Sequence, residues 1–308
     1  MPRAKPKLIC AIVPVGRTCR QSGRTAGQRR DAEAEETTEA RHDAVKAAPF
    51  DAARLDALLE DQGIDVLVAS SKHNVQYLLG GYRFFFFDYM DAIGVSRYLP
   101  VIVYQKGRPD NAAYIGYTLE RYEEQLGKFW PRVVETTAGD SPGAVQRAVK
   151  HIKGFAGPVG KVGVEAAFLP WGAAKVLQDE LGNCQLVDAT FPLERLRARK
   201  TRAELVQLRE ASERVVASML AVFDGCAPGQ TKNEFVDRLR REEVGRGLTF
   251  EYCLITGGTS LNRASSYQHL EAGDILPSIR GHYKGYIGDL CRMAFWASQT
   301  PSLLTFSA

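Results

Sequence analysis

Three residues near the end of the sequence carry side chains that can do chemistry: His282, Asp289 and Cys291. Divalent cations bind carboxylate oxygens and accept imidazole nitrogens, and a thiol becomes a nucleophile where a base activates it. Cys291 has no histidine close to it in the sequence, so we interpret it as a small buried residue. A single histidine in a strand is more often held by a hydrogen bond than by a metal, and we expect the same of His282.

Four short motifs occur in order around these residues. They are a basic helix start at Arg199–Glu204, a P-G-x-T turn at Ala227–Thr231, an L-x-x-G-D turn at Leu270–Asp274 and a G-Y-x-x-D-x-x-R strand at Gly285–Arg292. The ordered set resembles the pita-bread metallohydrolases, the creatinase, prolidase and aminopeptidase P family. Upstream, His73–Gly81 is similar to the S-x-x-N-x-x-Y-L-x-G segment of that family, so the resemblance runs from Phe50 to Phe295.

The resemblance implies a metal-dependent hydrolase of the Xaa-Pro peptidase type, which acts on a peptide or a small amide and forms a homodimer. Such enzymes hold a pair of divalent ions (Mn, Co or Zn) that lowers the pKa of a bridging water and stabilises the oxyanion formed from the attacked carbonyl. The ligand set that the resemblance implies is two aspartates on adjacent strands, then one histidine and two glutamates. Asp289 occupies the place of the second aspartate and is the one metal ligand that carries over. No catalytic or cofactor-binding residue is assigned.

The sequence departs from this ligand set at the other positions. Counting eleven residues back from Asp289 reaches Ser278, and no carboxylate stands between Asp274 and Asp289. After Asp289 the sequence contains no histidine, aspartate or glutamate. Because each lost ligand removes both coordination and negative charge, we expect this chain to bind no metal pair and to be inactive as a peptidase. We also expect it to be truncated within the catalytic domain, or to come from a faulty gene model.

Two other functions stay open. The first is a non-catalytic protein that dimerises through its amino-terminal domain. The second is an amidinohydrolase or a lyase on the same scaffold, since a fold alone does not choose the reaction. Proline specificity is in doubt as well, because the substrate-contacting histidine of the family is expected near Ser265, where the sequence has none.

The elements that must position these residues begin at Phe50. Leu55 and Leu59 fall on one helical stripe that Gly63 can end, and Ile64–Val68 follows as a strand. Further strands are expected over 99–104 and 161–165, and helices over 118–126, 143–152 and 172–181. This alternation of helices and strands predicts an α/β amino-terminal domain, creatinase-like by resemblance, over residues 49–192.

A short charged connection, Leu193–Lys200, is expected to lead into the second domain. Thr201–Glu204 and Thr231–Glu234 each have the capping-box pattern that begins a helix. Strands are expected after these helices, over 252–255, 274–276 and 283–287. The order predicts an α+β fold, which the resemblance makes the first part of a truncated pita-bread domain over residues 199–295, with a tail outside the family at 296–308.

Residues 1–48 differ in composition from the rest. Eight arginines and lysines precede Asp31, the first acidic residue, and the apolar run Leu8–Val15 is short and contains a proline. We expect a disordered or targeting-like leader that does not belong to the fold, and organelle targeting stays open.

Composition excludes several classes of protein. Hydrophobic residues make up 45% of the chain and charged residues 25%, which is typical of a globular protein. A net charge of +4 is too small to indicate a nucleic-acid partner. The sequence contains no run of eighteen uncharged apolar residues, so we expect neither a membrane-spanning helix nor a membrane partner. Six cysteines without a C-x-x-C pair favour a reduced, cytoplasmic protein.

Overall fold

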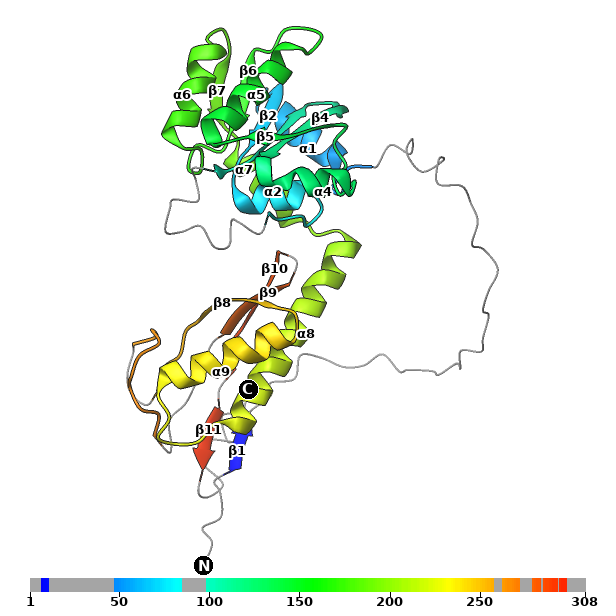
Figure 1. Cartoon of the computed structure of the whole chain (residues 1–308). Helices are drawn as coiled ribbons and strands as arrows, with labels where there is room; N and C mark the ends of the chain where they lie inside the picture. The colour runs from blue at the N-terminus through cyan, green and yellow to red at the C-terminus, as the bar shows by residue number, and fades with distance from the viewer. Residues whose placement is uncertain are drawn as a thin grey trace, which may run out of the picture. The chain divides into compact units, whose positions relative to one another are not determined.

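The computed structural model describes residues 7–10, 47–84, 98–257, 262–271, 279–283, 285–292 and 294–297. The chain divides into two compact units at Thr201 (Figure 1). The amino-terminal unit lies within residues 37–200. The carboxyl-terminal unit begins at Thr201 and also takes in the start of the chain.

The amino-terminal unit alternates helices and strands along the sequence. Its elements are α1 (Ala52–Glu60), β2 (Val66–Ala69), α2 (Lys72–Leu78), β3 (Val101–Gln105), β4 (Arg108–Tyr117), η3 (Thr118–Glu120), α4 (Arg121–Gln125), β5 (Val133–Ala138), α5 (Ser141–Lys153), β6 (Lys161–Val164), α6 (Trp171–Glu180), β7 (Gln185–Asp188) and α7 (Thr190–Ala198). The predicted α/β class is confirmed for this unit. Strands β4, β5 and β7 and helix α2 were not among the elements that the sequence predicted.

The described strands of this unit form a six-stranded sheet in the order β5-β4-β3-β2-β6-β7. Strand β2 runs parallel to β6 and antiparallel to β3. Strands β6 and β7 are parallel, and so are β4 and β5. The sheet is therefore mixed, and β2 lies inside it with a neighbour on each side.

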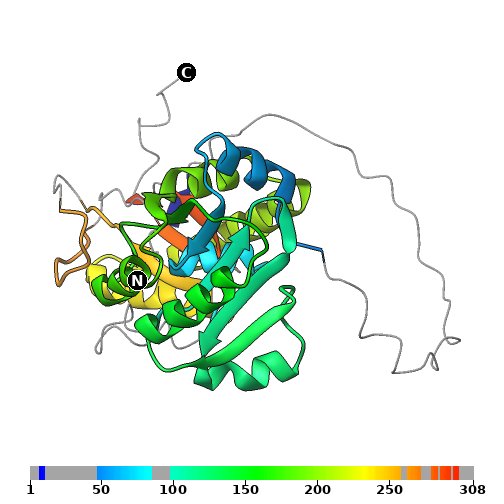
Figure 2. The same ribbon diagram turned by 90° about the horizontal axis from the view of Figure 1, so that it is seen from above.

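Both faces of this sheet are covered by helices, as Figures 1 and 2 show. Side chains alternate between the faces of a strand, so Leu67 and Ala69 of β2 join one core and Val66 and Val68 join the other. The first core also takes residues from α1, α2 and α7, and the second takes residues from α5 and α6. This arrangement explains why β2 is an uninterrupted apolar run.

Helices α1 and α2 each begin at a residue whose side chain caps the first helical turn. The side chain of Asp51 accepts a hydrogen bond from the backbone N–H of Arg54, and that of Ser71 accepts one from the backbone N–H of Asn74. These bonds satisfy N–H groups that have no partner within the first helical turn. The turn after α1 uses Gly63 at a φ of 62°, a conformation that favours glycine.

The segment before the carboxyl-terminal unit is a helix rather than a connection. Leu193–Lys200 was expected to be a short charged linker, but residues up to Ala198 belong to α7. Leu193 and Leu196 of this helix are buried in the first core. The charged residues between them hid this pattern, because only one narrow stripe of the helix is apolar.

The described carboxyl-terminal unit combines two helices with strands. Its elements are β1 (Lys7–Cys10), α8 (Arg202–Gly225), α9 (Lys232–Gly245), β8 (Thr249–Cys253), β9 (Ile279–Tyr283), β10 (Tyr286–Leu290) and β11 (Ala294–Ala297). Both predicted capping boxes are present, at Thr201 with Glu204 and at Thr231 with Glu234. Strands β10, β9 and β8 form an antiparallel sheet in that order, and apolar residues of α8, α9 and β8 share one core.

Two predicted strands of this unit differ from the structure. Residues 283–287 were expected to be one strand, but they turn a hairpin between β9 and β10, with Gly285 at a φ of 85°. The strand that was expected over residues 252–255 begins earlier, at Thr249, and ends at Cys253. The third predicted strand, 274–276, lies outside the described residues.

Strand β1 pairs antiparallel with β11, so that Leu8 lies opposite Trp296. Four residues of the expected leader thus pair with the region where the non-family tail was expected to begin, and the extent of both segments stays a prediction. The apolar run that begins at Leu8 suits a strand whose backbone pairs with another short apolar segment. Among the helices that the structure describes, none is long and apolar enough to cross a membrane.

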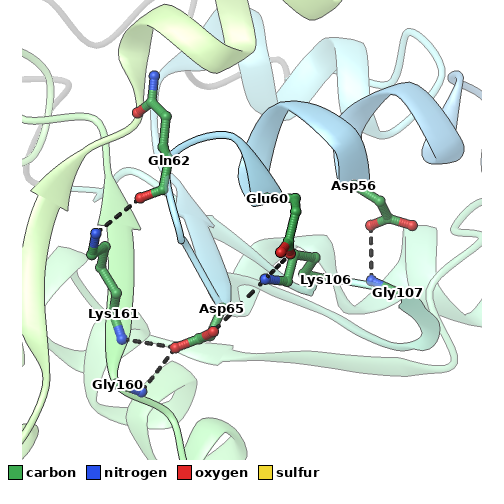
Figure 3. Close-up of polar contacts among 8 residues, drawn as sticks. All are labelled: Asp56, Glu60, Gln62, Asp65, Lys106, Gly107, Gly160 and Lys161. Carbon is green, nitrogen blue, oxygen red and sulfur yellow. Dashed lines mark hydrogen bonds and ion pairs between the residues drawn. The ribbon is translucent and has the colours of Figure 1, made fainter.

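A polar network closes the end of the sheet where β2 and β6 begin (Figure 3). Asp65 accepts hydrogen bonds from the backbone N–H groups of Gly160 and Lys161, both at 2.9 Å. Lys161 donates from its Nζ to the carbonyl of Gln62 at 2.9 Å. Lys106 forms an ion pair with Glu60 at 2.6 Å. The network therefore ties α1 and the first residues of β2 to the start of β6.

Replacing Asp65 tests this network. Asp65→Ala leaves the N–H groups of Gly160 and Lys161 without their acceptor, and we expect the free energy of unfolding of the full chain to fall by about 1 kcal/mol. Chemical denaturation followed by circular dichroism measures the change. The matched control is Asp61→Ala at an exposed position close by, which should change stability by less than about 0.5 kcal/mol. Equal effects of the two substitutions would contradict a specific role for Asp65.

Candidate functional site

Asp289 lies on β10, at the edge of the carboxyl-terminal sheet, and its side chain is exposed. Neighbouring side chains on this strand point to opposite faces. Gly288 is buried, whereas Ile287 and Asp289 are exposed. The carboxylate of Asp289 therefore belongs to the face of β10 opposite to the one that packs on α8.

The close approach of β10 to α8 depends on Gly288. A Cβ atom at this position would meet Cγ2 of Val215 at 3.1 Å and the backbone carbonyl oxygen of Ala211 at 3.3 Å. Both distances are shorter than ordinary van der Waals contact. Glycine at this position thus sets how far Asp289 stands from the helix.

The strand register gives the neighbours of Asp289. Arg280 of β9 lies directly opposite it, and His282 lies opposite Ile287. On its other side, β9 pairs with β8, which brings Thr249 opposite His282. The predicted ligand position thus has a basic residue as its cross-strand partner, where the family's metal centre calls for further acidic ligands.

The described residues do not fit a two-metal centre. Within the ranges that the structure describes, no three histidine, cysteine, aspartate or glutamate residues are grouped so that they could hold a metal ion. Asp274 and Ser278 lie outside those ranges. The metal-ligand role of Asp289 therefore stays a prediction from the resemblance.

Cys291 follows the last residue of β10 and is exposed. The interpretation of this residue as a buried one is wrong, because the strand ends at Leu290 and Cys291 lies beyond the sheet. Arg292 donates from Nη1 to the carbonyl oxygen of Cys291 at 2.8 Å.

A second polar cluster occupies the amino-terminal unit, where the parallel strands β2 and β6 end side by side. Glu165 follows β6 and is fully buried. One of its carboxylate oxygens accepts from the backbone N–H groups of Ser70 and Ser71 at 2.6 and 2.8 Å, and the other accepts from Nδ2 of Asn74 at 2.5 Å. Three donors thus replace the water that this carboxylate loses on burial.

Sequence analysis missed Glu165, although it had singled out the segment that contains Asn74. The available signal was a glutamate directly after the apolar strand 161–164. A carboxylate at the carboxyl end of a buried strand needs donors from a neighbouring element. Only the adjacency of β2 and β6 identifies the loop that begins α2 as their source.

His73 is half-buried beside this cluster, and its Nε2 lies 3.4 Å from the hydroxyl oxygen of Ser71. Its ring packs edge-on against Phe168, with 5.1 Å between centroids. Burial lowers the pKa of His73, the positive charge of Arg197 lowers it further, and the negative charge of Glu165 opposes both effects. The neutral imidazole is therefore favoured at physiological pH.

The carboxyl-terminal unit also has an open cavity of about 610 Å³ beside the start of α9. Glu234, Asp237, Tyr267 and His269 are among its lining residues. His269 shares a 2.7 Å hydrogen bond through Nδ1 with the carbonyl oxygen of Gly229, which ties the segment before Leu270 to the P-G-x-T turn. Backbone hydrogen bonds between Gly229 and Leu270, and between Leu270 and Gln230, place Leu270 beside the same turn.

The sequence profile of the Creatinase/Prolidase N-terminal domain family matches residues 52–199. These residues are a creatinase/prolidase N-terminal domain. The predicted resemblance to the creatinase, prolidase and aminopeptidase P family is thereby confirmed for this domain. The matched region begins at α1 and ends one residue after α7, so it contains the whole six-stranded sheet of the described residues. No curated protein matches the sequence.

Solved structures show the same fold. The Xaa-Pro dipeptidase from Bacillus anthracis is similar with a TM-score of 0.65 and 20% identity, covering 82% of this chain and 66% of its own. The prolidase from Pyrococcus horikoshii has a TM-score of 0.61 and 16% identity, and the match covers 79% of this chain and 63% of the prolidase. The X-Pro aminopeptidase from Thermotoga maritima has a TM-score of 0.61 and 15% identity, and the match covers 82% of this chain and 67% of the aminopeptidase. The chain thus spans about two thirds of the length of these proteins, and the similarity extends beyond the creatinase/prolidase domain.

Filling the space at Gly288 tests how Asp289 is positioned. Gly288→Ala forces β10 away from α8, and we expect the free energy of unfolding to fall by about 1–3 kcal/mol because the added methyl group has no room. Denaturation of the full chain measures the loss. Ile287→Val, on the exposed face of the same strand, is the control and should change stability by less than about 0.5 kcal/mol. A fully tolerated alanine would show that α8 does not limit the position of β10.

Proposed function

We propose that this chain carries the scaffold of metal-dependent hydrolases of the Xaa-Pro peptidase type, and that the 308-residue polypeptide does not itself cleave Xaa-Pro bonds. The match of residues 52–199 to the creatinase/prolidase N-terminal domain supports the first part. The observation that carries the second part is the environment of Asp289. It is an exposed carboxylate on an edge strand, opposite Arg280 and without a further metal-ligating pair beside it among the described residues.

The physical reason is charge and coordination. Two divalent ions held close together repel each other, and protein sites offset this repulsion with several carboxylate oxygens. One carboxylate supplies too few donor atoms and too little negative charge for two divalent ions. Asp289 alone therefore cannot hold such a pair.

The relatives suggest which substrates to offer. The similar structures are named as a prolidase, an Xaa-Pro dipeptidase and an X-Pro aminopeptidase. An Xaa-Pro dipeptide and an Xaa-Pro-containing tripeptide are therefore the substrates to test. Both a dipeptidase and an aminopeptidase reaction are then covered.

The test compares the purified chain with Asp289→Ala. In Mn²⁺ or Co²⁺ we expect both proteins to release no proline-containing product above the rate without protein. Isothermal titration with Mn²⁺ should show no tight binding of two ions to either one, because the other ligands are missing. Circular dichroism confirms that the two proteins are equally folded.

One result would overturn the proposal. If the unaltered chain cleaved the peptides in a Mn²⁺-dependent manner and Asp289→Ala abolished that activity, the chain would hold a working metal centre. Its remaining ligands would then have to come from residues outside the described ranges.

A further inference from the structure

Glu243 is a buried carboxylic acid in the last turn of α9. Its side chain is fully inaccessible to solvent, and neither carboxyl oxygen has a hydrogen-bond partner among the described residues. Buried polar groups are nearly always paired, because an unpaired one loses its hydration without compensation. The group is therefore an exception that calls for a physical explanation.

The surroundings of Glu243 favour its neutral form. It follows Leu239 by one helical turn, and Leu239 shares a core with Leu248 and Cys253. The charge of Glu243 acts on the Cys253 thiol of β8. Burial raises the pKa of Cys253 to about 12, and the charge of Glu243 contributes to that rise. Leu239, Leu248 and Cys253 carry no positive charge that could stabilise an ionised Glu243.

The nearby arginines are engaged elsewhere. Arg246, one turn along from Glu242, forms an ion pair with that residue. Arg214 of α8 pairs with Glu210 at 2.8 Å and donates to the carbonyl oxygen of Arg246 at 2.6 Å. No cation of the described α8, α9 or β8 residues therefore pairs with Glu243.

The backbone at this point adds to the effect. The carbonyl oxygen of Glu243 accepts from the N–H groups of Arg246 and Leu248, both at 3.0 Å, as α9 ends. The end of a helix carries partial negative charge and disfavours a nearby anion. Gly247, at a φ of 74°, then turns the chain into β8.

We propose that Glu243 is a proton-controlled latch: its neutral carboxyl group keeps the end of α9 packed on β8, and its ionisation drives the side chain into water and releases this end. The same sheet carries Asp289 on β10, so release of β8 changes the support of the candidate site. The latch does not depend on the proposed function, because it involves only the packing of α9 on β8.

The direction of the pH dependence follows from linkage. Burial raises the pKa of Glu243 to about 7 in the folded state. The folded state thus holds its proton more tightly than the unfolded state, and the stabilisation is complete at pH values below the ordinary range of a glutamic acid. It is lost as the pH rises through about 7.

Hydrogen exchange of the full chain measures the release directly. After correction for the intrinsic exchange rate, we expect the opening equilibrium of the 246–253 segment to rise about tenfold between pH 6 and pH 8, as a pKa near 7 requires. Segments of the amino-terminal unit should show no such rise. The melting temperature should fall over the same pH interval.

Two substitutions and a control make the test specific. Glu243→Gln removes the titration and should abolish the tenfold rise, and Glu243→Met should do the same if the glutamine variant folds poorly. Glu242→Gln, at the neighbouring and partly exposed carboxylate, should keep it. A rise that persists in the Glu243 variants, or an unaltered chain without any rise, would overturn the proposal. Neither result bears on the absence of peptidase activity, which the Asp289 comparison tests separately.

Discussion

Burial of β2 on both faces is the constraint on which the amino-terminal domain depends. Its four residues send alternate side chains into two separate cores, and each core is closed by its own helices. A strand in this position cannot slip by one residue without exchanging the two sets. The positions of Ser70 and Ser71 at its end are therefore fixed, and so is the place where the carboxylate of Glu165 finds its donors.

Three carboxyl groups of this chain are handled in different ways. Glu165 is buried with three donors, as a buried polar group requires. Asp289 stays exposed at the edge of the described three-stranded sheet. Glu243 is buried without a donor among the described residues, and its neutral form is the one that suits that place. Burial and the supply of donors decide the chemistry of each group more than its residue type does.

The elements that sequence patterns located well are those with strong local signals. Helix α1, its glycine turn and strand β2 follow from leucine spacing and an apolar run, and both capping boxes in the carboxyl-terminal unit are present. Elements with mixed composition were missed. Strand β5 contains glutamate and threonines because it is an edge strand, and α7 alternates arginines with a few buried leucines. The hairpin at Gly285 was read as one strand because its turn is short and its flanks are similar.

The sequence by itself determined the family, the α/β class of the first domain and the scarcity of metal-ligating residues around Asp289, because these depend on residue types and their order. Tertiary structure alone decided which residues meet: Glu165 with Asn74, Arg280 opposite Asp289, and Glu243 beside Cys253. The first pair joins segments far apart in the sequence, so its proximity follows from the order of the strands, which the burial of the whole domain sets and no local pattern shows. The other two pairs lie on consecutive elements, and the strand register and the packing of α9 on β8 decide that they meet.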